Sequence, residues 1–271
     1  MTAPAVTLSP SPGSGAEFAR PRVVGDAMTI AWRNLLNIRR NPELLVFATI
    51  QPVIFVVMFR YVFGGAIRVP GVSYVDYLMP GIFVQTVVFG SLTTGVGLAE
   101  DLQRGLVDRF RSLPMARSAV LIGRTLADLV RNVFVVALMC IVGFAVGWRP
   151  SGSVTAVVGG VGLVLAFAYA LSWLFAIVGL TVRDSETAQV ASFPILAPLV
   201  FASSAFVPIS SMPGWLQVFA NHQPVSVVVN AVRDLTLGVP VGSHVLAAIA
   251  WIVAIVAVCA PIAVARYRRA V

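Results

Sequence analysis

The chain has 271 residues, a net charge of +8 and a large excess of apolar side chains. Hydrophobic residues make up 58% of it and charged residues only 11%, about half the charged fraction of an ordinary soluble domain. Several apolar runs reach the roughly 20 residues that a helix needs to cross a bilayer. This composition excludes a soluble globular protein. It predicts an all-α, polytopic helical membrane protein, because helices satisfy their own backbone hydrogen bonds in lipid.

The positive charge comes entirely from Arg, since the sequence contains no Lys. In a membrane protein such charge records orientation and contact with anionic lipid, so we expect membrane lipid and no nucleic acid as a partner. Without Lys the chain cannot form a Walker A phosphate loop, so any ATP and Mg must be bound by another chain. Cys140 and Cys259 lie inside apolar runs without His neighbours, so we expect no metal and no cofactor in this chain.

The N-terminal part divides into a tail and a helix. Residues 1–25 are rich in Pro, Ser, Gly and Ala, which predicts a disordered tail, and they lack the apolar core of a signal peptide. Residues 26–41 predict an amphipathic helix with Arg33 and Arg40 on the polar side and Trp32 on the apolar side. A basic helix directly before a span is expected to lie in the membrane interface.

The remainder, residues 42–271, is predicted to form one domain with six transmembrane helices. The expected spans cover residues 44–63, 78–99, 132–148, 154–182, 188–207 and 245–264. Small residues at the end of the second span favour close helix contact, and Pro194 and Pro198 predict a kink in the fifth. Between the last two spans, residues 208–244 are divided by Pro and Gly into two short helical pieces, at about 215–220 and 225–237. We expect the second piece to be a re-entrant or interfacial element.

The Arg distribution predicts the orientation. With six spans, 15 of the 19 Arg residues fall on the side that holds both termini, and four fall on the other side. The positive-inside rule therefore predicts that both termini and residues 100–131 are cytoplasmic. We expect a multi-pass protein of a bacterial plasma membrane. A seventh span at residues 225–237 would move Arg266, Arg268 and Arg269 to the outside, so we reject that alternative.

A charged segment, residues 100–131, interrupts the apolar runs and holds six Arg residues. Leu102, Leu106 and Phe110 have helical spacing, and Pro114 ends this periodic run. A short basic amphipathic helix between two spans is suited to receive a soluble partner. The same pattern is typical of a positive loop that only fixes topology, and the pattern does not choose between the two.

Asp128 lies in the second half of this segment. It follows Arg124 by four residues and precedes Arg131 by three, and both spacings bring side chains together on a helix. We therefore expect Asp128 to pair with one of these two Arg residues.

Three stretches carry more specific information than the periodicity. They are NPELLVFATIQPVIFVVMF at residues 41–59, DRFRSLPMARSAVLIGRTLADLVRN at residues 108–132, and FASSAFVPISSMPGWLQVFANHQPVSVVVNAVRDL at residues 201–235. Together they resemble the permease subunits of type-2 ABC exporters, especially the daunorubicin-resistance type. The resemblance covers nearly everything from Asp26 to the C-terminus.

The resemblance implies a six-span protomer that pairs with a second permease, identical or different, and binds two copies of a separate ABC ATPase. In such permeases the loop after the second span carries a coupling helix that docks on the ATPase. The resemblance therefore favours coupling over a plain positive loop for residues 100–131. The residues expected to contribute to coupling are Glu100, Asp101, Arg104, Asp108, Arg109, Phe110, Arg111, Leu113 and Pro114.

The resemblance also implies two external re-entrant helices that cap the translocation path. The residues that it marks in this region are Pro208, Pro213, Trp215, Pro224, Arg233 and Asp234. Arg233 and Asp234 can act as a gate pair or as solvated interfacial charges. We favour solvated charges, because adjacent residues do not face each other on a helix.

The span interiors offer candidates for a path for an amphipathic or aromatic solute. These are Gln51, Phe55, Phe59, Phe83, Gln85 and Phe89. A Gln in a span can equally hydrogen-bond to a neighbouring helix, and Phe commonly faces lipid, so the structural interpretation stays open beside the functional one.

The expected function is export of a hydrophobic or amphipathic drug or secondary metabolite by alternating access, with no catalytic residue in this chain. The alternative within the transporters is export of a lipid-linked glycan or envelope lipid. From other classes we keep an ATP-independent channel or scaffold, and an intramembrane hydrolase. The hydrolase would use Ser226, Asp234 and either His222 or His244, but no G-x-S-x-G or H-E-x-x-H motif accompanies them.

Overall fold

The computed structural model describes residues 23–40, 42–65, 67, 69, 71–105, 117–240 and 242–270. All regular structure in these residues is helical, so the all-α prediction is confirmed. The elements are α1 (Val23–Arg40), α2 (Pro42–Met58), the π-helical turn η1 (Phe59–Phe63), α3 (Tyr74–Gln103), α5 (Arg117–Ala145), α6 (Val154–Gly179), α7 (Ser185–Phe201), the 3₁₀ turn η2 (Ile209–Ser211), α8 (Gly214–His222), α9 (Pro224–Leu237) and α10 (Ser243–Ala270).

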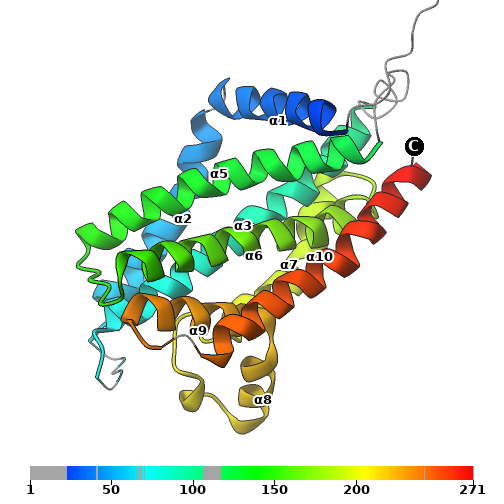
Figure 1. The fold of residues 1–271 in the computed structure, drawn as a ribbon. Coiled ribbons are helices and arrows are strands. Elements are labelled where there is room, and N and C mark those ends of the chain that lie inside the picture. Colours follow the sequence, from blue (N-terminus) through cyan, green and yellow to red (C-terminus); the bar gives the residue numbers. More distant parts are fainter. Residues whose placement is uncertain are drawn as a thin grey trace, which may run out of the picture.

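The long helices form a bundle around α3 (Figure 1). Helices α5, α6, α7 and α9 all pack against α3, while α1 lies along α5 and α10 packs on α6 and α9. The C-terminal end of α10 lies at the end of the bundle where α5 begins, and α8 and α9 lie at the opposite end (Figure 1). The described parts of the charged segment, at the end of α3 and the start of α5, therefore lie at the same end of the bundle as the C-terminal end of α10.

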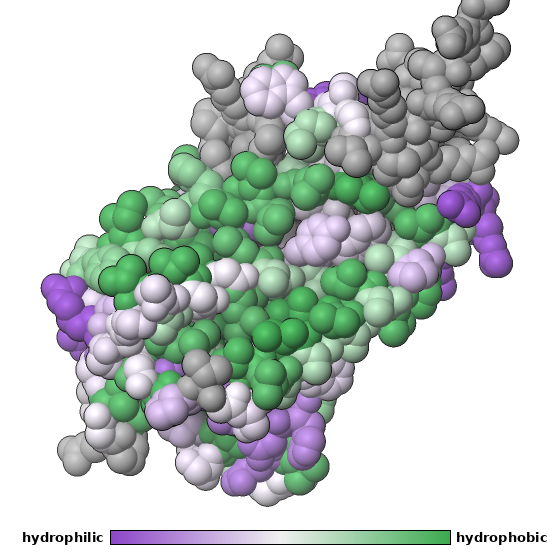
Figure 2. Space-filling view, in the orientation of Figure 1, coloured by the Kyte–Doolittle hydropathy of each residue, from purple (hydrophilic) through white to green (hydrophobic). Residues whose placement is uncertain are grey.

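Four of the described helices are long and apolar enough to cross a membrane. They are Tyr74–Gln103, Ala119–Ala145, Val154–Gly179 and Ser243–Arg269. The predicted first span is a shorter apolar helix, Ala48–Phe63, and the predicted fifth span is the 17-residue helix α7. Figure 2 shows the matching surface, a broad apolar zone across the visible face with hydrophilic residues gathered at its ends. The chain is thus a helical membrane protein.

One predicted boundary differs clearly from the structure. The third span was expected from residue 132, but α5 begins at Arg117 and continues through the charged residues without a break. Polar side chains in its first half bind Asp101 and Thr94 on α3. Because these contacts satisfy them within the bundle, the helix does not have to end where they occur. The second half of the charged segment is therefore the start of α5.

Helices α3 and α6 cross so closely that their backbones are in contact. A Cβ atom added to Gly95 would overlap the carbonyl oxygen of Phe175, and one added to Gly179 would overlap the carbonyl oxygen of Gly95. Near this crossing the Ser91 hydroxyl donates a hydrogen bond of 3.1 Å to the carbonyl oxygen of Ala168. The close helix contact predicted from the small residues of the second span is confirmed.

Arg233 fixes α9 to the rest of the bundle and is not a solvated charge. Its side chain is 8% exposed, its Nε donates to the carbonyl oxygen of Tyr77 at 3.2 Å, and its Nη2 donates to that of Ser204 at 2.8 Å. Nη1 donates to Asn230 Oδ1 at 2.8 Å, and the guanidinium lies 3.6 Å from the centre of the Tyr77 ring. Burial lowers the pKa of Arg233 below its ordinary value, but a guanidinium remains charged. The favoured interpretation was therefore wrong for this residue.

The other side chains suggested for a hydrolase do not form a catalytic group. Ser226 Oγ accepts from the backbone N–H of Ser204 and from Gln223 Nε2, whereas His222 Nδ1 contacts the carbonyl oxygen of Val218. His244 pairs instead with Asp234, at 2.7 Å. Within the described residues the Ser226 hydroxyl therefore contacts neither imidazole, the one imidazole–carboxylate pair lies apart from it, and the structure gives the hydrolase hypothesis no support.

The glycine crossing predicts that Gly95→Ala will destabilise the bundle, because the new methyl group forces α3 and α6 apart at Phe175. Overpacking of this kind costs about 1–3 kcal/mol. The measurement is thermal unfolding of the detergent-purified protein, followed by size-exclusion chromatography after heating. Gly162→Ala on α6 is the matched control, since a Cβ there meets no atom within 4 Å. Equal losses in the two variants would contradict the prediction.

The Arg233 contacts predict a loss of roughly 3 kcal/mol for Arg233→Leu, because two backbone carbonyl groups lose a charged donor. Arg233→Lys should recover only part of the loss, since an ammonium group cannot reproduce the planar set of three bonds. The same unfolding assay measures both, with Arg268→Leu as the control at an exposed Arg. An unchanged unfolding temperature for Arg233→Leu would rule out an anchoring role.

Candidate translocation cavity and coupling region

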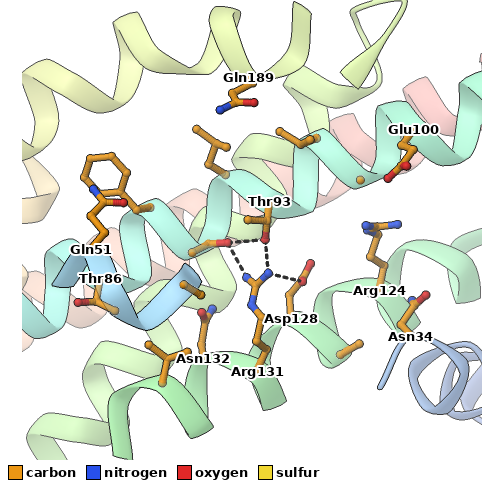
Figure 3. Close-up of a pocket in the computed structure, with 18 of the residues that line it drawn as sticks. Asn34, Gln51, Thr86, Thr93, Glu100, Arg124, Asp128, Arg131, Asn132 and Gln189 are labelled. Atoms are coloured by element: carbon orange, nitrogen blue, oxygen red, sulfur yellow. Dashed lines mark hydrogen bonds and ion pairs between the residues drawn. The ribbon is translucent and has the colours of Figure 1, made fainter. Parts of the chain in front are cut away.

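A cavity of about 730 Å³ lies between α2, α3, α5 and α7, with one lining residue from α1 (Figure 3). This volume is within the range of pockets that hold drug-sized molecules. The lining residues are Asn34, Ala48, Gln51, Pro52, Gln85, Thr86, Phe89, Gly90, Leu92, Thr93, Val96, Gly97, Glu100, Asp101, Arg104, Arg124, Ala127, Asp128, Arg131, Asn132, Val135, Gln189 and Phe193.

One wall of the cavity, formed by α3 and α5, carries linked polar groups (Figure 3). Asp128 Oδ2 accepts a hydrogen bond of 2.6 Å from the Thr94 hydroxyl, and its Oδ1 lies 3.6 Å from Arg131. Arg131 also donates to the Thr93 hydroxyl and, at 2.6 Å, to the carbonyl oxygen of Gly90. The prediction that Asp128 pairs with a helical neighbour is confirmed, with Arg131 as the partner.

Two glycines of α3 make room for this wall. A Cβ on Gly97 would overlap the Arg124 guanidinium, and one on Gly90 would lie 2.6 Å from Asn132 Oδ1. Because the glycines have no side chain, the long side chains of α5 can reach the surface of α3. Arg124 uses this access to form an ion pair with Asp101.

The opposite wall is less charged and partly aromatic. Gln51 on α2 and Gln189 on α7 are both exposed, and Gln189 points toward the interior of the cavity in Figure 3. Phe193 of α7 supplies aromatic surface, and Phe89 adds to it from α3. In the described residues, no ion pair joins α2 or α7 to the charged wall. The described part of the cavity therefore combines a cross-linked polar wall with an uncharged wall that no salt bridge joins to it.

The structure separates the six residues suggested for a translocation path. Gln51, Gln85 and Phe89 line the cavity. Phe83 is 1% exposed, meets Trp148 edge-on with ring centres 5.2 Å apart, and does not line the cavity. The remaining two, Phe55 and Phe59, pack on Phe206 outside the cavity lining, with ring centres 5.9 and 4.6 Å away.

The structure describes residues 100–105 and 117–131, the two ends of the segment that is expected to contribute to coupling. Glu100 pairs with Arg104 at 2.6 Å within one helical turn, and Asp101 pairs with Arg124 across from α3 to α5. These four side chains also line the cavity, so the base of the region and the cavity share residues. The other residues expected to contribute to coupling lie outside the described part; they are Asp108, Arg109, Phe110, Arg111, Leu113 and Pro114.

The N-terminal helix α1 has one face on the bundle and one face exposed. Ile30 and Ala31 are buried, and Ile30 packs with Leu98 and Leu121. Trp32 is 64% exposed, and Arg33 is exposed as well. The helix starts at Val23, three residues before the start predicted from the sequence.

Prolines mark the starts of η2, α8 and α9. Pro208 and Pro213 directly precede η2 and α8, and Pro224 is the first residue of α9. Trp215 on α8 is 76% exposed, whereas Arg233 on α9 is buried in the network described above.

Reasoning from the sequence missed several cavity residues, notably Asn132, Gln189 and Phe193. A usable signal was present on α5, where Arg124, Asp128 and Arg131 recur at helical spacing and predict one polar face. No comparable signal marks Gln189 or Phe193, because they reach the cavity only through the packing of α7 on α3.

Comparison with known proteins agrees with this membrane architecture. The model of the ABC-2 type transporter family matches residues 26–237. Daunorubicin resistance ABC transporter permease protein DrrB1 of Streptomyces coeruleorubidus is 34% identical over 255 residues, covering 94% of this chain and 90% of that protein. Probable doxorubicin resistance ABC transporter permease protein DrrC of Mycobacterium tuberculosis is 29% identical, covering 99% and 98%.

A more distant similarity extends to another transport permease. The putative transport permease ycf38 of Porphyra purpurea is 25% identical over 219 residues, which is 78% of this chain and 74% of that protein. The family match spans most of the chain, and the relatives align over nearly their whole lengths. The chain therefore belongs to the ABC-2 type transporter family, as one of its membrane permeases.

Proposed function

We propose that this chain is the permease subunit of an ATP-driven exporter of amphipathic, drug-like molecules. The observation that carries the proposal is the cavity, which has the volume of a drug-sized molecule and lies directly beside the expected coupling region. The names of the relatives, which are daunorubicin and doxorubicin resistance permeases, support an aromatic drug or secondary metabolite as the cargo.

The active form proposed here contains two permease protomers and two copies of a separate ATPase that binds ATP and Mg. The absence of Lys from the chain supports a separate ATPase, because a Walker A loop requires Lys. Six spans with both termini in the cytoplasm agree with the Arg distribution. In this orientation the described ends of the coupling region, Glu100 and Arg124, face the cytoplasmic ATPase, and α8 and α9 lie on the external side as re-entrant helices.

The proposed mechanism is alternating access by movement of helices, without covalent chemistry in this chain. Closure of the ATPase dimer moves the coupling region, and the Asp101–Arg124 pair transmits this movement to both α3 and α5. The opposite wall of the cavity, on α2 and α7, then changes its distance from the α3–α5 wall. The interfacial helix α1 follows α5, because the two pack along each other.

Export is tested by producing the chain with its candidate ATPase in a drug-sensitive bacterium and measuring cellular daunorubicin by its fluorescence. We expect lower accumulation than in cells with an empty vector, and we expect the difference to disappear when the Walker A Lys of the ATPase is changed to Ala. Daunorubicin levels that do not depend on the permease would exclude this cargo. If cells with the Walker A variant accumulated as little daunorubicin as cells with the unchanged ATPase, ATP-driven export would be excluded.

Coupling is tested by capture of the ATPase on the detergent-solubilised permease. The double variant Arg109→Glu/Phe110→Ala reverses one charge and removes one aromatic side chain, so we expect capture to fall at least tenfold. This corresponds to about 1.4 kcal/mol or more of binding free energy. Arg149→Glu/Trp215→Ala makes the same kinds of change at exposed residues toward the opposite end of the bundle and should capture normally. Capture that is equal in both double variants would place docking elsewhere.

A further inference from the structure

Unpaired polar atoms are concentrated at the cavity. In the described residues, seven buried side-chain nitrogen or oxygen atoms have no hydrogen-bond partner, and four of them belong to residues that line the cavity. These four are Asn34 Nδ2, Gln85 Oε1, Arg124 Nε and Asn132 Nδ2. An unpaired buried polar group costs about 1–3 kcal/mol, so such groups are rare in folded proteins and their clustering calls for an explanation.

These four atoms differ in their hydrogen-bonding role. Three of them are N–H donors and one is a carbonyl acceptor. A ligand that satisfies them must therefore present mainly acceptors, such as carbonyl or ether oxygens. Apolar surface for the rest of such a ligand comes from Phe89, Phe193 and Val135.

The charges of the cavity do not select for a charged ligand. Its six ionisable lining residues form three ion pairs, which are Glu100–Arg104, Asp101–Arg124 and Asp128–Arg131. A charged group of a ligand finds no unpaired opposite charge among these six residues, so it gains nothing by entering the paired part of the cavity. This favours recognition through hydrogen bonds and aromatic contact.

The described walls of the site come from one chain. They belong to five helices of the same protomer, and Gln85 and Asn132 stand on the neighbouring helices α3 and α5. The Asn132 amide lies against Gly90 through Oδ1, and its Nδ2 has no partner among the described residues.

We propose that each protomer holds its own substrate site in this cavity, specific for an aromatic molecule whose polar groups are mainly hydrogen-bond acceptors, with Asn132 and Gln85 as specificity-determining residues. The proposal rests on the proposed function for the identity of the cargo. Its binding test does not require transport or the ATPase, so the two can fail separately.

The first test is equilibrium binding of daunorubicin to the purified permease in lipid nanodiscs, read from the drug's fluorescence. We expect one bound molecule per chain. Asn132→Leu and Gln85→Leu should each raise the dissociation constant at least threefold, because each removes a hydrogen bond. Asn221→Leu makes the same change at an exposed residue of α8 and should bind normally. One bound molecule per two chains, or unchanged affinity in both cavity variants, would overturn the proposal.

Matched competitors test the acceptor chemistry. Anthraquinone and anthracene share the same fused-ring frame, but only the quinone carries carbonyl oxygens. We expect anthraquinone to displace daunorubicin at a concentration at least threefold lower than anthracene requires, and we expect this difference to vanish in Asn132→Leu. Equal displacement by the two competitors in the unchanged protein would overturn the acceptor preference.

Thiol labelling locates the site independently of any effect of the Leu variants on folding. Cys140 and Cys259 are first changed to Ser, and a single Cys is then introduced as Gln189→Cys in the cavity or Asn221→Cys outside it. We expect daunorubicin to slow maleimide labelling at position 189 and to leave position 221 unaffected. Labelling at 189 that is insensitive to a saturating drug concentration would contradict binding in the cavity. Export that persists with this result would leave the proposed function intact and remove only the site.

Discussion

The close crossing of α3 and α6 is the contact on which the arrangement of the other helices depends. Gly95 and Gly179 bring the two backbones together, and a side chain at either position would overlap a carbonyl oxygen. Since α3 is also the helix on which α5, α7 and α9 pack, its position relative to α6 defines the positions of these neighbours. In lipid, where burial of apolar surface does not distinguish one apolar neighbour from another, such close van der Waals contact is a main source of helix association.

Polar contacts fasten the two ends of α3 in different ways. Near its start, Arg233 binds the Tyr77 carbonyl group and ring, and toward its end Asp101 and Thr94 bind side chains of α5. Removal of one partner from a buried pair leaves an uncompensated charge, so α3 and α5 are expected to move together. This makes the α3–α5 wall the side of the cavity that ion pairs hold together, whereas α2 and α7 contribute uncharged residues to the lining.

Sequence patterns predicted the architecture well because hydropathy and helical spacing are local properties. The all-α class, the pairing of Asp128 with Arg131 and the small-residue contact of α3 all follow from residues close together in the chain. The environment of Arg233 did not follow, because its partners Tyr77 and Ser204 are distant in sequence and two of the groups that it binds are backbone carbonyls. Arg233 was interpreted as solvated because the adjacent Asp234 cannot face it on a helix, and no local pattern pointed to its distant partners.

The cavity was only partly predictable. Gln51, Gln85 and Phe89 stand out as polar or aromatic residues in apolar runs, and all three line it. Phe83 has the same local signal but packs on Trp148, since the face of α3 that it occupies is covered by other helices. Only the three-dimensional packing shows which face of each helix is covered. Single-sequence periodicity does not contain that information when a helix is apolar on every side.

The continuity of α5 from Arg117 to Ala145 has a mechanical consequence. Twenty-nine residues at 1.5 Å per residue make a rod about 43 Å long, with one end at the coupling region and the other at the opposite end of the bundle. If such a rod pivots at one end by about 10°, its far end is displaced by about 7 Å. A rotation of this size would change the helix spacing at the far end by about the width of a side chain. An unbroken helix turns as one body along its whole length, whereas a helix break inside α5 would shorten the part that turns together.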